Sequence, residues 1–328
     1  MLLIITNKSD LACDYLILRL HELNINFKRL NTERYNDEYE VDIFVSNNEY
    51  NFKITFSDGV VISKENIKAV YFRQPILPDL KNNVELLHVE FANREVAELL
   101  RCLWRVIPIG KWLNHPKSLW LASNKIEQLH IAANLGFIIP NTCISACQKT
   151  IEEFINTNNG DVIGKAIKHG FYPVNDTVWF AATQEIPSNF TEEFHSYAKI
   201  PMIYQEKISK ISDIRVTVVG SNVYATEIAS RENSKTKIDW RLWDAYDIDL
   251  PHNPITLPEN IADNCVKITY HHKLKYSAID LIRTPEEDYI FLEMNPNGQW
   301  AWIEQLVNYP IRDAIIDTLG VLRYEKRK

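Results

Sequence analysis

The chain has 328 residues, more than one small hydrophobic core requires, and this length predicts two or three domains. Its composition is ordinary for a soluble globular protein, with 46% hydrophobic and 24% charged residues, and the formal net charge of -7 disfavours binding to nucleic acid. No stretch approaches the roughly 20 apolar residues of a membrane span, and the five cysteines form no Cys-x-x-Cys pair. We therefore expect a cytoplasmic protein with reduced thiols and with neither a membrane nor a nucleic acid as partner.

The first part of the chain has the pattern of an α/β lobe. The apolar run Leu2–Thr6 predicts a strand of a parallel sheet, and Ser9 or Asp10 can cap the helix that follows it. The lobe is also expected to contain strands at residues 27–30, 50–56, 60–63 and 67–72 and a helix at residues 83–105. We expect residues 1–111 to form this N-terminal lobe, with a doubly wound character.

Residues 112–202 are expected to form a central lobe. Pro116 suits the first turn of a helix, and the helical spacing of apolar residues continues to Gly136. The lobe should then contain a strand near Thr142, a helix at residues 151–156, two strands within residues 161–180 and a helix at residues 188–198.

The remaining residues, 203–328, have the pattern of a C-terminal lobe with a sheet and covering helices. Residues 213–230 alternate around a Gly-Ser-Asn turn, as in a β-hairpin. The lobe starts around the segment MIYQEKI, and further strands are expected at residues 277–282 and 289–294, with helices at residues 259–272, after residue 299 and at residues 311–319.

Acidic and amide side chains gather at the end of the last expected strand. Glu293 and Asn295 are two residues apart, so a strand directs them to the same face. Asp280 lies on the preceding strand, which we expect to be a neighbour in the sheet. Carboxylate and amide oxygens in this arrangement are typical of a Mg²⁺ site that also receives phosphate oxygens. The alternative is an acidic strand end followed by an Asn-Pro turn.

Two lysines and two arginines are candidate ligands for anions. Lys165 lies within an apolar strand, where an ammonium group needs an anionic partner, and Lys125 lies at a helix turn. Arg215 and Arg241 can reach oxygens that become charged during phosphoryl transfer. The alternative interpretation is that the two lysines are ordinary surface residues. In the same way, Arg215 and Arg241 would form ion pairs with Asp213 and Asp239 instead of binding an anion. The chain lacks the glycine fingerprints of P-loop and Rossmann nucleotide sites.

These motifs, in this order, resemble the ATP-grasp superfamily over roughly residues 112–300. The matching segments are SNKIEQLHIAANLGFIIPNT, VIGKAIKHG, YQEKI, DIR, AIDLI and EMNPNG. The resemblance implies an α/β ATP-grasp fold, in which an N-terminal pre-ATP-grasp lobe precedes the central and C-terminal lobes that clasp ATP.

The same resemblance implies roles for particular residues. It implies nucleotide phosphates at Lys125 and Lys165, adenine beside Glu206, Lys207 and Ile208, ribose near Asp213, and two Mg²⁺ ions at Asp280, Glu293 and Asn295. We expect Arg215, Arg241 and Lys165 to be catalytic. The arginines would hold an acyl phosphate, and the lobe that carries Lys165 would close over the nucleotide and keep water out. No histidine stands out as a general base, and Asp213 is a candidate proton acceptor.

Within the superfamily the chain is most similar to the microviridin-type peptide macrocyclases, or graspetide ligases. The segments YFRQP, LNHP, DIRVTVVG, IDWR and NGQWAWIE carry this similarity. It implies a precursor peptide whose leader docks on the enzyme and whose Asp or Glu side chains are activated with ATP. A Thr or Ser hydroxyl, or a Lys amine, then closes an ω-ester or ω-amide ring. The family also implies a homodimer, and residues 188–198 and 216–228 are candidates for a groove that holds the leader.

Two other functions remain open. An ATP-grasp ligase that adds free amino acids to a peptide or protein terminus would share every nucleotide-binding residue, so only the product distinguishes the two. A catalytically inactive ATP-grasp domain that serves as a peptide-binding scaffold is the second alternative. The intact lysines and the intact acidic and amide residues of the expected metal site argue against the scaffold.

Overall fold

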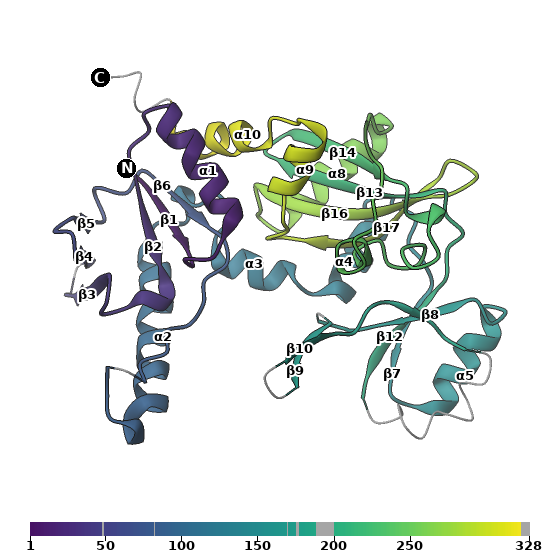
Figure 1. Cartoon of the computed structure of the whole chain (residues 1–328), viewed down its shortest axis with the longest axis horizontal. Coiled ribbons are helices and arrows are strands. Elements are labelled where there is room, and N and C mark those ends of the chain that lie inside the picture. The colour runs from purple at the N-terminus through teal and green to yellow at the C-terminus, as the bar shows by residue number, and fades with distance from the viewer. Residues whose placement is uncertain (48, 82, 169, 175–176, 188–199, 323–328) are drawn as a thin grey trace.

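The computed structural model describes the whole chain except residues 48, 82, 169, 175–176, 188–199 and 323–328. Figure 1 shows the N-terminal part of the chain at one end of an elongated molecule, with a large sheet and a smaller sheet at the other end. The C-terminal helix α10 (Ile311–Leu319) returns to the N-terminal part and packs there. In the described part of the chain, no helix is long and apolar enough to span a membrane.

The N-terminal part contains a parallel sheet in the order β2-β1-β6, formed by Phe27–Asn31, Leu2–Thr6 and Ala69–Phe72. Side chains of β1 alternate between two cores, as a strand requires. Leu2 and Ile4 pack with helices α1 (Leu11–Glu22) and α10, whereas Leu3 and Ile5 pack with helix α2 (Val89–Val106). The expected strand, helix and α/β character of this region are confirmed, and Asp10 caps α1 by accepting a hydrogen bond from the backbone N–H of Cys13.

A small antiparallel sheet, β3-β4-β5, covers the same face of the parallel sheet as α2 does. Its strands are Tyr39–Val45, Tyr50–Phe56 and Val61–Ser63. The sequence predicted β4 and β5 but not β3, whose apolar residues alternate with acidic ones in a charged segment.

The large sheet is antiparallel and runs β15-β14-β13-β16-β17. Its strands are His252–Ile255, Asn222–Ile228, Ser212–Val219, Tyr276–Arg283 and Tyr289–Asn295. One face packs on helices α4 (Lys125–Asn134) and α8 (Glu259–His271) through residues such as Val216, Val218 and Ile279. The alternate residues of these strands therefore face the other way, and they include Asp213, Arg215 and Asp280.

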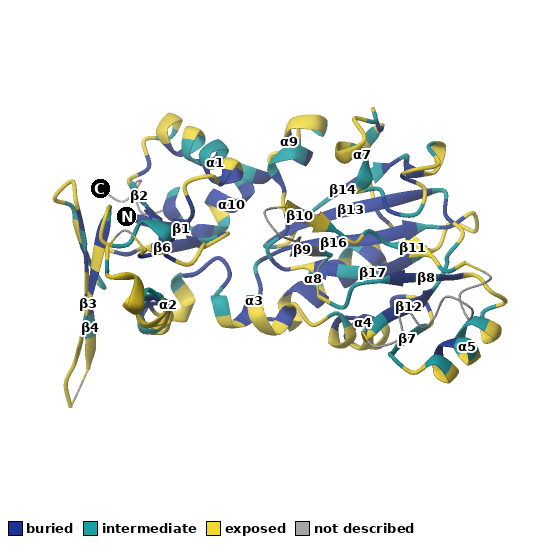
Figure 2. Cartoon of the chain, turned by 60° about the horizontal axis from the view of Figure 1, so that its bottom comes forward, coloured by how far each residue is buried: buried dark blue, intermediate teal, exposed yellow. Residues whose placement is uncertain are grey.

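A smaller sheet, β11-β8-β12-β7, lies beside the large one (Figure 2). Its strands are Gln184–Glu185, Val162–Lys165, Met202–Glu206 and Thr142–Ser145, and helix α5 (Gln148–Thr157) packs against it. A separate hairpin is formed by β9 (Phe171–Val174) and β10 (Thr177–Phe180). In the described ranges the other helices are α3 (Pro116–Ala122), α7 (Leu242–Ala245) and α9 (Ala301–Val307), with short 3₁₀ turns at Thr32–Arg34, Leu86–His88, Ile109–Lys111 and Ser230–Glu232.

Two predictions for the middle of the chain were wrong in detail. The single helix expected from Pro116 to Gly136 is two helices, because the Asn124 side chain accepts hydrogen bonds from the backbone N–H groups of Ile126 and Glu127 and starts α4 anew. The segment expected to hold two strands holds three, β8, β9 and β10. The helix predicted at residues 188–198 lies outside the described residues.

Candidate active site

A cavity of about 560 Å³ lies between the large and the small sheet. All of the site residues predicted from the sequence line this one cavity: Lys125, Lys165, Glu206, Lys207, Ile208, Asp213, Arg215, Arg241, Asp280, Glu293 and Asn295. They come from strands, helices and loops spread along the chain between Lys125 and Asn295. The fold therefore brings the predicted residues together.

Asp280 faces the cavity by the alternation of strand β16, whereas Glu293 faces it because strand β17 contains a β-bulge. Asp280 on β16 pairs with Glu293, whereas the next residue, Leu281, pairs with Phe291, so Leu292 is the extra residue. Phe291 and Met294 pack in the core, and the bulge lets Leu292 and Glu293 both line the cavity. Without it, strict alternation would turn Glu293 toward the core.

Cations surround the Glu293 carboxylate. Lys125 Nζ lies 2.9 Å from Glu293 Oε2, and Arg241 Nη1 lies 3.9 Å from Glu293 Oε1. Burial acts to raise the pKa of Glu293, but Lys125, Lys165 and Arg241 outweigh it and lower this pKa to about 2. Glu293 is thus ionised at neutral pH and holds the cationic side chains around it.

Asp280 is held by Arg215. The Arg215 guanidinium donates from Nη1 to both carboxylate oxygens, at 2.9 and 3.1 Å. Burial raises the pKa of Asp280 although Arg215 opposes this, and the neighbouring Glu293 carboxylate acts in the same direction as burial. Two carboxylates at neighbouring positions repel each other, so this pair is well suited to a cation placed between them.

Lys165, the last residue of β8, is a half-buried ammonium group next to other cations. Burial lowers the pKa of Lys165 to about 8, and Lys125 and Arg241 act in the same direction, while Glu293 opposes them. A cluster of three cationic side chains that shares one carboxylate is poised to bind a polyanion such as a nucleotide phosphate chain.

Arg241 is anchored by Asp239. Its Nε and Nη2 atoms each donate to Asp239 at 2.7 Å, and the guanidinium lies 5.5 Å from the centre of the Phe180 ring. Asp239 also accepts a hydrogen bond from the backbone N–H of Thr183 at 3.1 Å. The ion pair with Asp239, which the sequence offered as the alternative to an anion-binding role for Arg241, is therefore formed. Nη1 of Arg241 nevertheless still faces Glu293.

Arg215 does not pair with the aspartate two residues before it. Asp213 instead accepts hydrogen bonds from Lys210 Nζ and Ser230 Oγ, and it is buried. Burial raises the pKa of Asp213, although Lys210 opposes this. Both of these donors bind the same oxygen, Oδ2, so the other oxygen remains available toward the cavity that Asp213 lines.

The segment after β12 crosses the edge of the cavity. Glu206 Oε2 accepts a hydrogen bond from the backbone N–H of Asn141 at 3.2 Å, and Lys207 Nζ lies 3.0 Å from Asp161 and 3.6 Å from Glu185. These contacts hold both side chains against residues of the small sheet and its loops, and residues 206–208 line the cavity.

The donor set fits magnesium and nucleotide phosphates. Asp280, Glu293 and Asn295 offer hard oxygen atoms on one wall, while Lys125 and Lys165 offer ammonium groups in the same cavity. Among the described residues there is no group of three or more His, Cys, Asp and Glu side chains that could hold a metal ion unaided.

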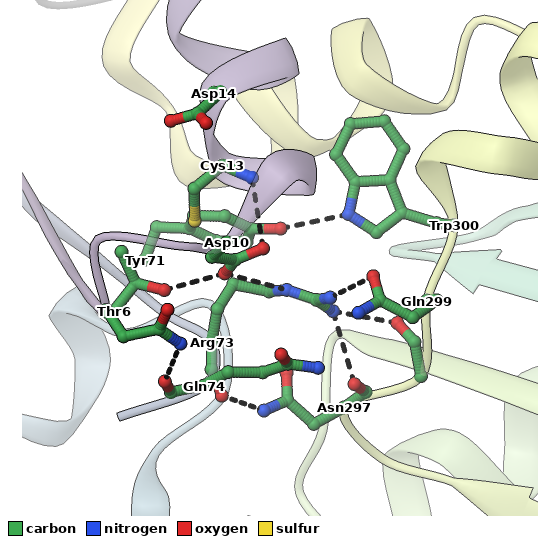
Figure 3. A network of polar contacts seen from close by, with 12 residues as sticks. Thr6, Asp10, Cys13, Asp14, Tyr71, Arg73, Gln74, Asn297, Gln299 and Trp300 are labelled. Atoms are coloured by element: carbon green, nitrogen blue, oxygen red, sulfur yellow. Dashed lines mark hydrogen bonds and ion pairs between the residues drawn. The ribbon is translucent and has the colours of Figure 1, made fainter. Parts of the chain in front are cut away.

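The sequence analysis missed residues that support the site. Gln128, on α4, is buried and donates to the backbone oxygens of Ala122 and Met294, and it accepts from the N–H of Met294. Arg73, from the YFRQP segment, is 1% exposed and reaches residues 297–299 (Figure 3). Only its place directly after two aromatic residues at a strand end was visible in the sequence, because its partners at residues 297–299 lie more than 200 positions away.

Comparisons with known proteins support the ligase character of the site. Two family models match the chain, the MvdD pre-ATP grasp domain over residues 1–119 and the RimK-like ATP-grasp domain over residues 122–319. No curated protein sequence matches it.

Solved structures of similar fold include a RiPP-associated ATP-grasp ligase from Chryseobacterium gregarium, in complex with ADP and a leader and core peptide. It is 27% identical, with a TM-score of 0.89, over 97% of this chain and 96% of that chain. The macrocyclase MdnC from Microcystis aeruginosa MRC, bound with precursor peptide MdnA, shares the fold at 24% identity and a TM-score of 0.83, over 97% of this chain and 99% of that chain.

Proposed function

The chain belongs to the RimK-like ATP-grasp family, and we propose that it is an ADP-forming ligase that closes rings in a ribosomally made precursor peptide. The observation that carries this proposal is the cavity in which two carboxylates on paired strands are enclosed by Lys125, Lys165, Arg215 and Arg241. The likeness over nearly the whole chain to a RiPP-associated ligase that binds ADP, a leader and a core peptide supports a peptide substrate.

The proposed reaction has two steps. An Asp or Glu side chain of the peptide attacks the γ-phosphorus of ATP, and ADP leaves. A Thr or Ser hydroxyl, or a Lys amine, then attacks the carbonyl carbon of this acyl phosphate, loses its proton, and inorganic phosphate leaves with one oxygen of the former carboxylate. The result is an ω-ester or an ω-amide ring. Activation is needed because oxide is too poor a leaving group for a free carboxylate.

The cationic residues have distinct roles in this proposal. Lys125 and Lys165 hold nucleotide phosphates, and Lys165 also closes over them and keeps water from the acyl phosphate. Arg241, already oriented by Asp239, holds the oxygens on which charge develops during phosphoryl and acyl transfer, and Arg215 contributes to the same field while it fixes Asp280.

The remaining site residues contact the cofactors. We assign Asp280, Glu293 and Asn295 to two Mg²⁺ ions, which when bound would neutralise the phosphate charge. Residues Glu206, Lys207 and Ile208 contact adenine, largely through their backbone, and Asp213 lies near the ribose. The free oxygen of Asp213 suits a hydroxyl group of a sugar better than the role of proton acceptor, because Lys210 already neutralises this carboxylate.

The organisation of the whole protein is also proposed. We divide the chain into an N-terminal lobe of residues 1–111, a central lobe of residues 112–202 and a C-terminal lobe of residues 203–328, which limited proteolysis can test. The five cysteines are free, which supports a cytoplasmic protein, and we propose a homodimer, which light scattering would decide.

The leader peptide is proposed to dock on the enzyme outside the cavity. Of the two segments expected to form its groove, residues 188–198 lie outside the described residues. The other segment, the β13–β14 hairpin, contributes Val223 and Ala225 to a second cavity of about 390 Å³, which is also lined by Ile255 and Leu257. This cavity is the described part of that candidate groove.

The proposal is tested by the intact mass of a precursor peptide incubated with the enzyme, ATP and Mg²⁺. A suitable peptide is a small one encoded beside this gene, with Thr or Ser residues and Asp or Glu residues in its core. Loss of one water for each ring supports macrocyclisation, and hydroxylamine then distinguishes esters from amides. A mass gain equal to an amino acid would instead identify an amino-acid ligase. Peptide binding without any ADP release would identify an inactive scaffold.

A further inference from the structure

Arg73 is a buried cation at the boundary between the N-terminal sheet and the C-terminal part of the chain. It follows β6 directly and is 1% exposed. Its nearest acidic group is Asp10, with 3.8 Å between Arg73 Nε and Asp10 Oδ2, and Arg73 Nε forms no hydrogen bond in the described structure. Asp10 is itself fixed, because Thr6 Oγ1 donates to it at 2.6 Å and it caps helix α1. A buried charge of this kind is costly unless it is paired, so its role needs an explanation.

The other end of the guanidinium holds three consecutive residues. Nη1 donates to the backbone oxygens of Asn297 and Gly298, at 3.2 and 2.7 Å, and Nη2 donates to Gln299 Oε1 at 2.7 Å. In return, Asn297 Nδ2 donates to the backbone oxygen of Arg73. Figure 3 shows Arg73 between Asp10 on one side and Asn297 and Gln299 on the other. One side chain from the first lobe therefore fixes a segment, residues 297–299, that has no regular secondary structure of its own.

The same segment contacts one proposed metal ligand, Asn295, directly and is linked to another, Asp280, through Arg215. The backbone N–H of Asn297 donates to Asn295 Oδ1 at 3.0 Å. The backbone oxygen of Gln299 accepts from Arg215 Nη2 at 3.3 Å, and Arg215 in turn holds Asp280 through two hydrogen bonds. Arg73 is thus two contacts away from Asn295 on one side and three contacts away from Asp280 on the other.

We propose that Arg73 is a positioning residue for the metal site, a role that the N-terminal lobe supplies to the C-terminal lobe. Its planar fork meets three acceptors on one segment, and that segment sets the orientation of the Asn295 side chain and of the Arg215–Asp280 pair. A lysine would keep the charge but not the geometry, because its ammonium group is a point charge without a rigid fork. The inference rests on the proposed function only in placing Mg²⁺ at Asp280, Glu293 and Asn295.

The test compares Arg73→Lys with Arg19→Lys. Arg19 is a matched control, because its guanidinium also joins the N-terminal part to a C-terminal helix, through Nε and Nη2 bonds of 2.7 and 3.1 Å to Asp313, but it does not line the cavity. Calorimetry measures ADP binding across a Mg²⁺ titration, so no peptide is needed. We expect Arg73→Lys to raise the Mg²⁺ concentration for half-maximal binding by about 10- to 100-fold, the range found when a group that orients a metal ligand is lost. Arg19→Lys should leave this concentration unchanged.

A second variant keeps the test decisive if Arg73→Lys does not fold. Asn297→Ala removes one bond of the same segment, leaves the arginine intact, and should shift the Mg²⁺ requirement in the same direction at an unchanged melting temperature. The proposal is overturned if either folded variant binds ADP with the Mg²⁺ dependence of the wild type, or if only the melting temperature falls. It is also overturned if ADP binding to the wild type does not depend on Mg²⁺. A wild type that binds Mg²⁺ and ADP but never alters a peptide would contradict the proposed function and leave the role of Arg73 supported.

Discussion

The carboxylate of Glu293 is the anion that the cationic side chains of the cavity share. Lys125 contacts it directly, and Lys165 and Arg241 also stabilise its charged form. We expect Glu293→Gln to lower the turnover number by about 100-fold or more, because the loss of even an orienting neighbour of a metal ligand costs about 10- to 100-fold. Steady-state ADP release in the presence of peptide measures this. Peptide binding should survive, because the substitution changes no shape.

The matched control for this substitution is Glu287→Gln. Glu287 lies in the turn between β16 and β17, where it is exposed and pairs with Arg283. Its loss should leave turnover within a factor of two or so, since exposed ion pairs contribute little, about 0–1 kcal/mol. Full activity of Glu293→Gln would remove this residue from the proposed metal site.

Lys165 gives the nucleotide site a pH dependence. Its pKa of about 8 lies below the ordinary value for lysine, so the side chain loses its proton as the pH rises through 8. A bound phosphate favours the charged ammonium and raises this pKa, so binding takes up a proton at pH 8.5 but not at pH 6.5. Above pH 8, ADP affinity should fall, by at most about tenfold for each pH unit.

Proton uptake is measured by calorimetry of ADP binding in two buffers with different heats of ionisation. Lys165→Met should abolish the uptake at pH 8.5. Lys111→Met is the control, because burial lowers the pKa of Lys111 as well but this residue does not line the cavity. Equal heats in both buffers at pH 8.5 for the wild type would show that Lys165 does not meet the phosphates.

The site residues could be predicted to the extent that each lies in a short motif whose chemistry is visible locally. Lys165 in an apolar strand and the Glu293–Asn295 spacing are such cases, and the fold brings both to the cavity. The partners could not be predicted, because they depend on strand register. Arg215 lies opposite Asp280 in the β13–β16 ladder and pairs with it, although Asp213 is closer in sequence. Arg73 was missed because its partners at residues 297–299 are brought to it by the packing of distant parts of the chain.

At the scale of elements, the strand β17 and the segment after it carry more of the site than any other part of the chain. The bulge at Leu292 turns Glu293 toward the cavity, and Gly298 allows a close approach behind Arg215. An added Cβ at Gly298 would lie 2.5 Å from Ala278 Cβ and 2.8 Å from Arg215 Nη2.

Gly298→Ala should therefore destabilise the protein by about 1–3 kcal/mol, as overpacking commonly does, and should also reduce turnover by displacing Arg215. Thermal unfolding and ADP release measure the two effects. Gly110→Ala is the control, because no atom lies within 4 Å of its added Cβ, and it should be neutral. If Gly298→Ala matched the wild type in both assays, the segment would be less tightly packed than we describe.

Most elements were predictable from local patterns, and the failures have local causes too. Strand β1 is a continuous apolar run between two cores, and the hairpins β4–β5 and β13–β14 have glycine turns. The break between α3 and α4 was missed, because an Asn cap inside a periodic helix pattern does not interrupt the apolar spacing. Strand β3 was missed, because alternating acidic residues are unusual in strands.

At the scale of the whole molecule, the expected ATP-grasp fold with an N-terminal pre-ATP-grasp region is confirmed by the two family matches and the similar solved structures. The arrangement has a physical consequence. The cavity takes Lys165 from the small sheet and both carboxylates from the large sheet, while Arg73 links the N-terminal sheet to the segment beside them. All three sheets must therefore be in place for the site to form. Sequence patterns alone do not encode such contacts between distant sheets.

The central claim, that the enzyme transfers the γ-phosphoryl group to a peptide carboxylate, is tested most directly with an isotope. A precursor peptide whose Asp and Glu side chains carry ¹⁸O is incubated with the enzyme, ATP and Mg²⁺, and the released inorganic phosphate is analysed by mass spectrometry. We expect one ¹⁸O atom in phosphate for each ring closed, because phosphate leaves with a carboxylate oxygen. Ring closure with unlabelled phosphate would contradict the claim, since the hydroxyl or amine partner, and not the carboxylate, would then have been activated.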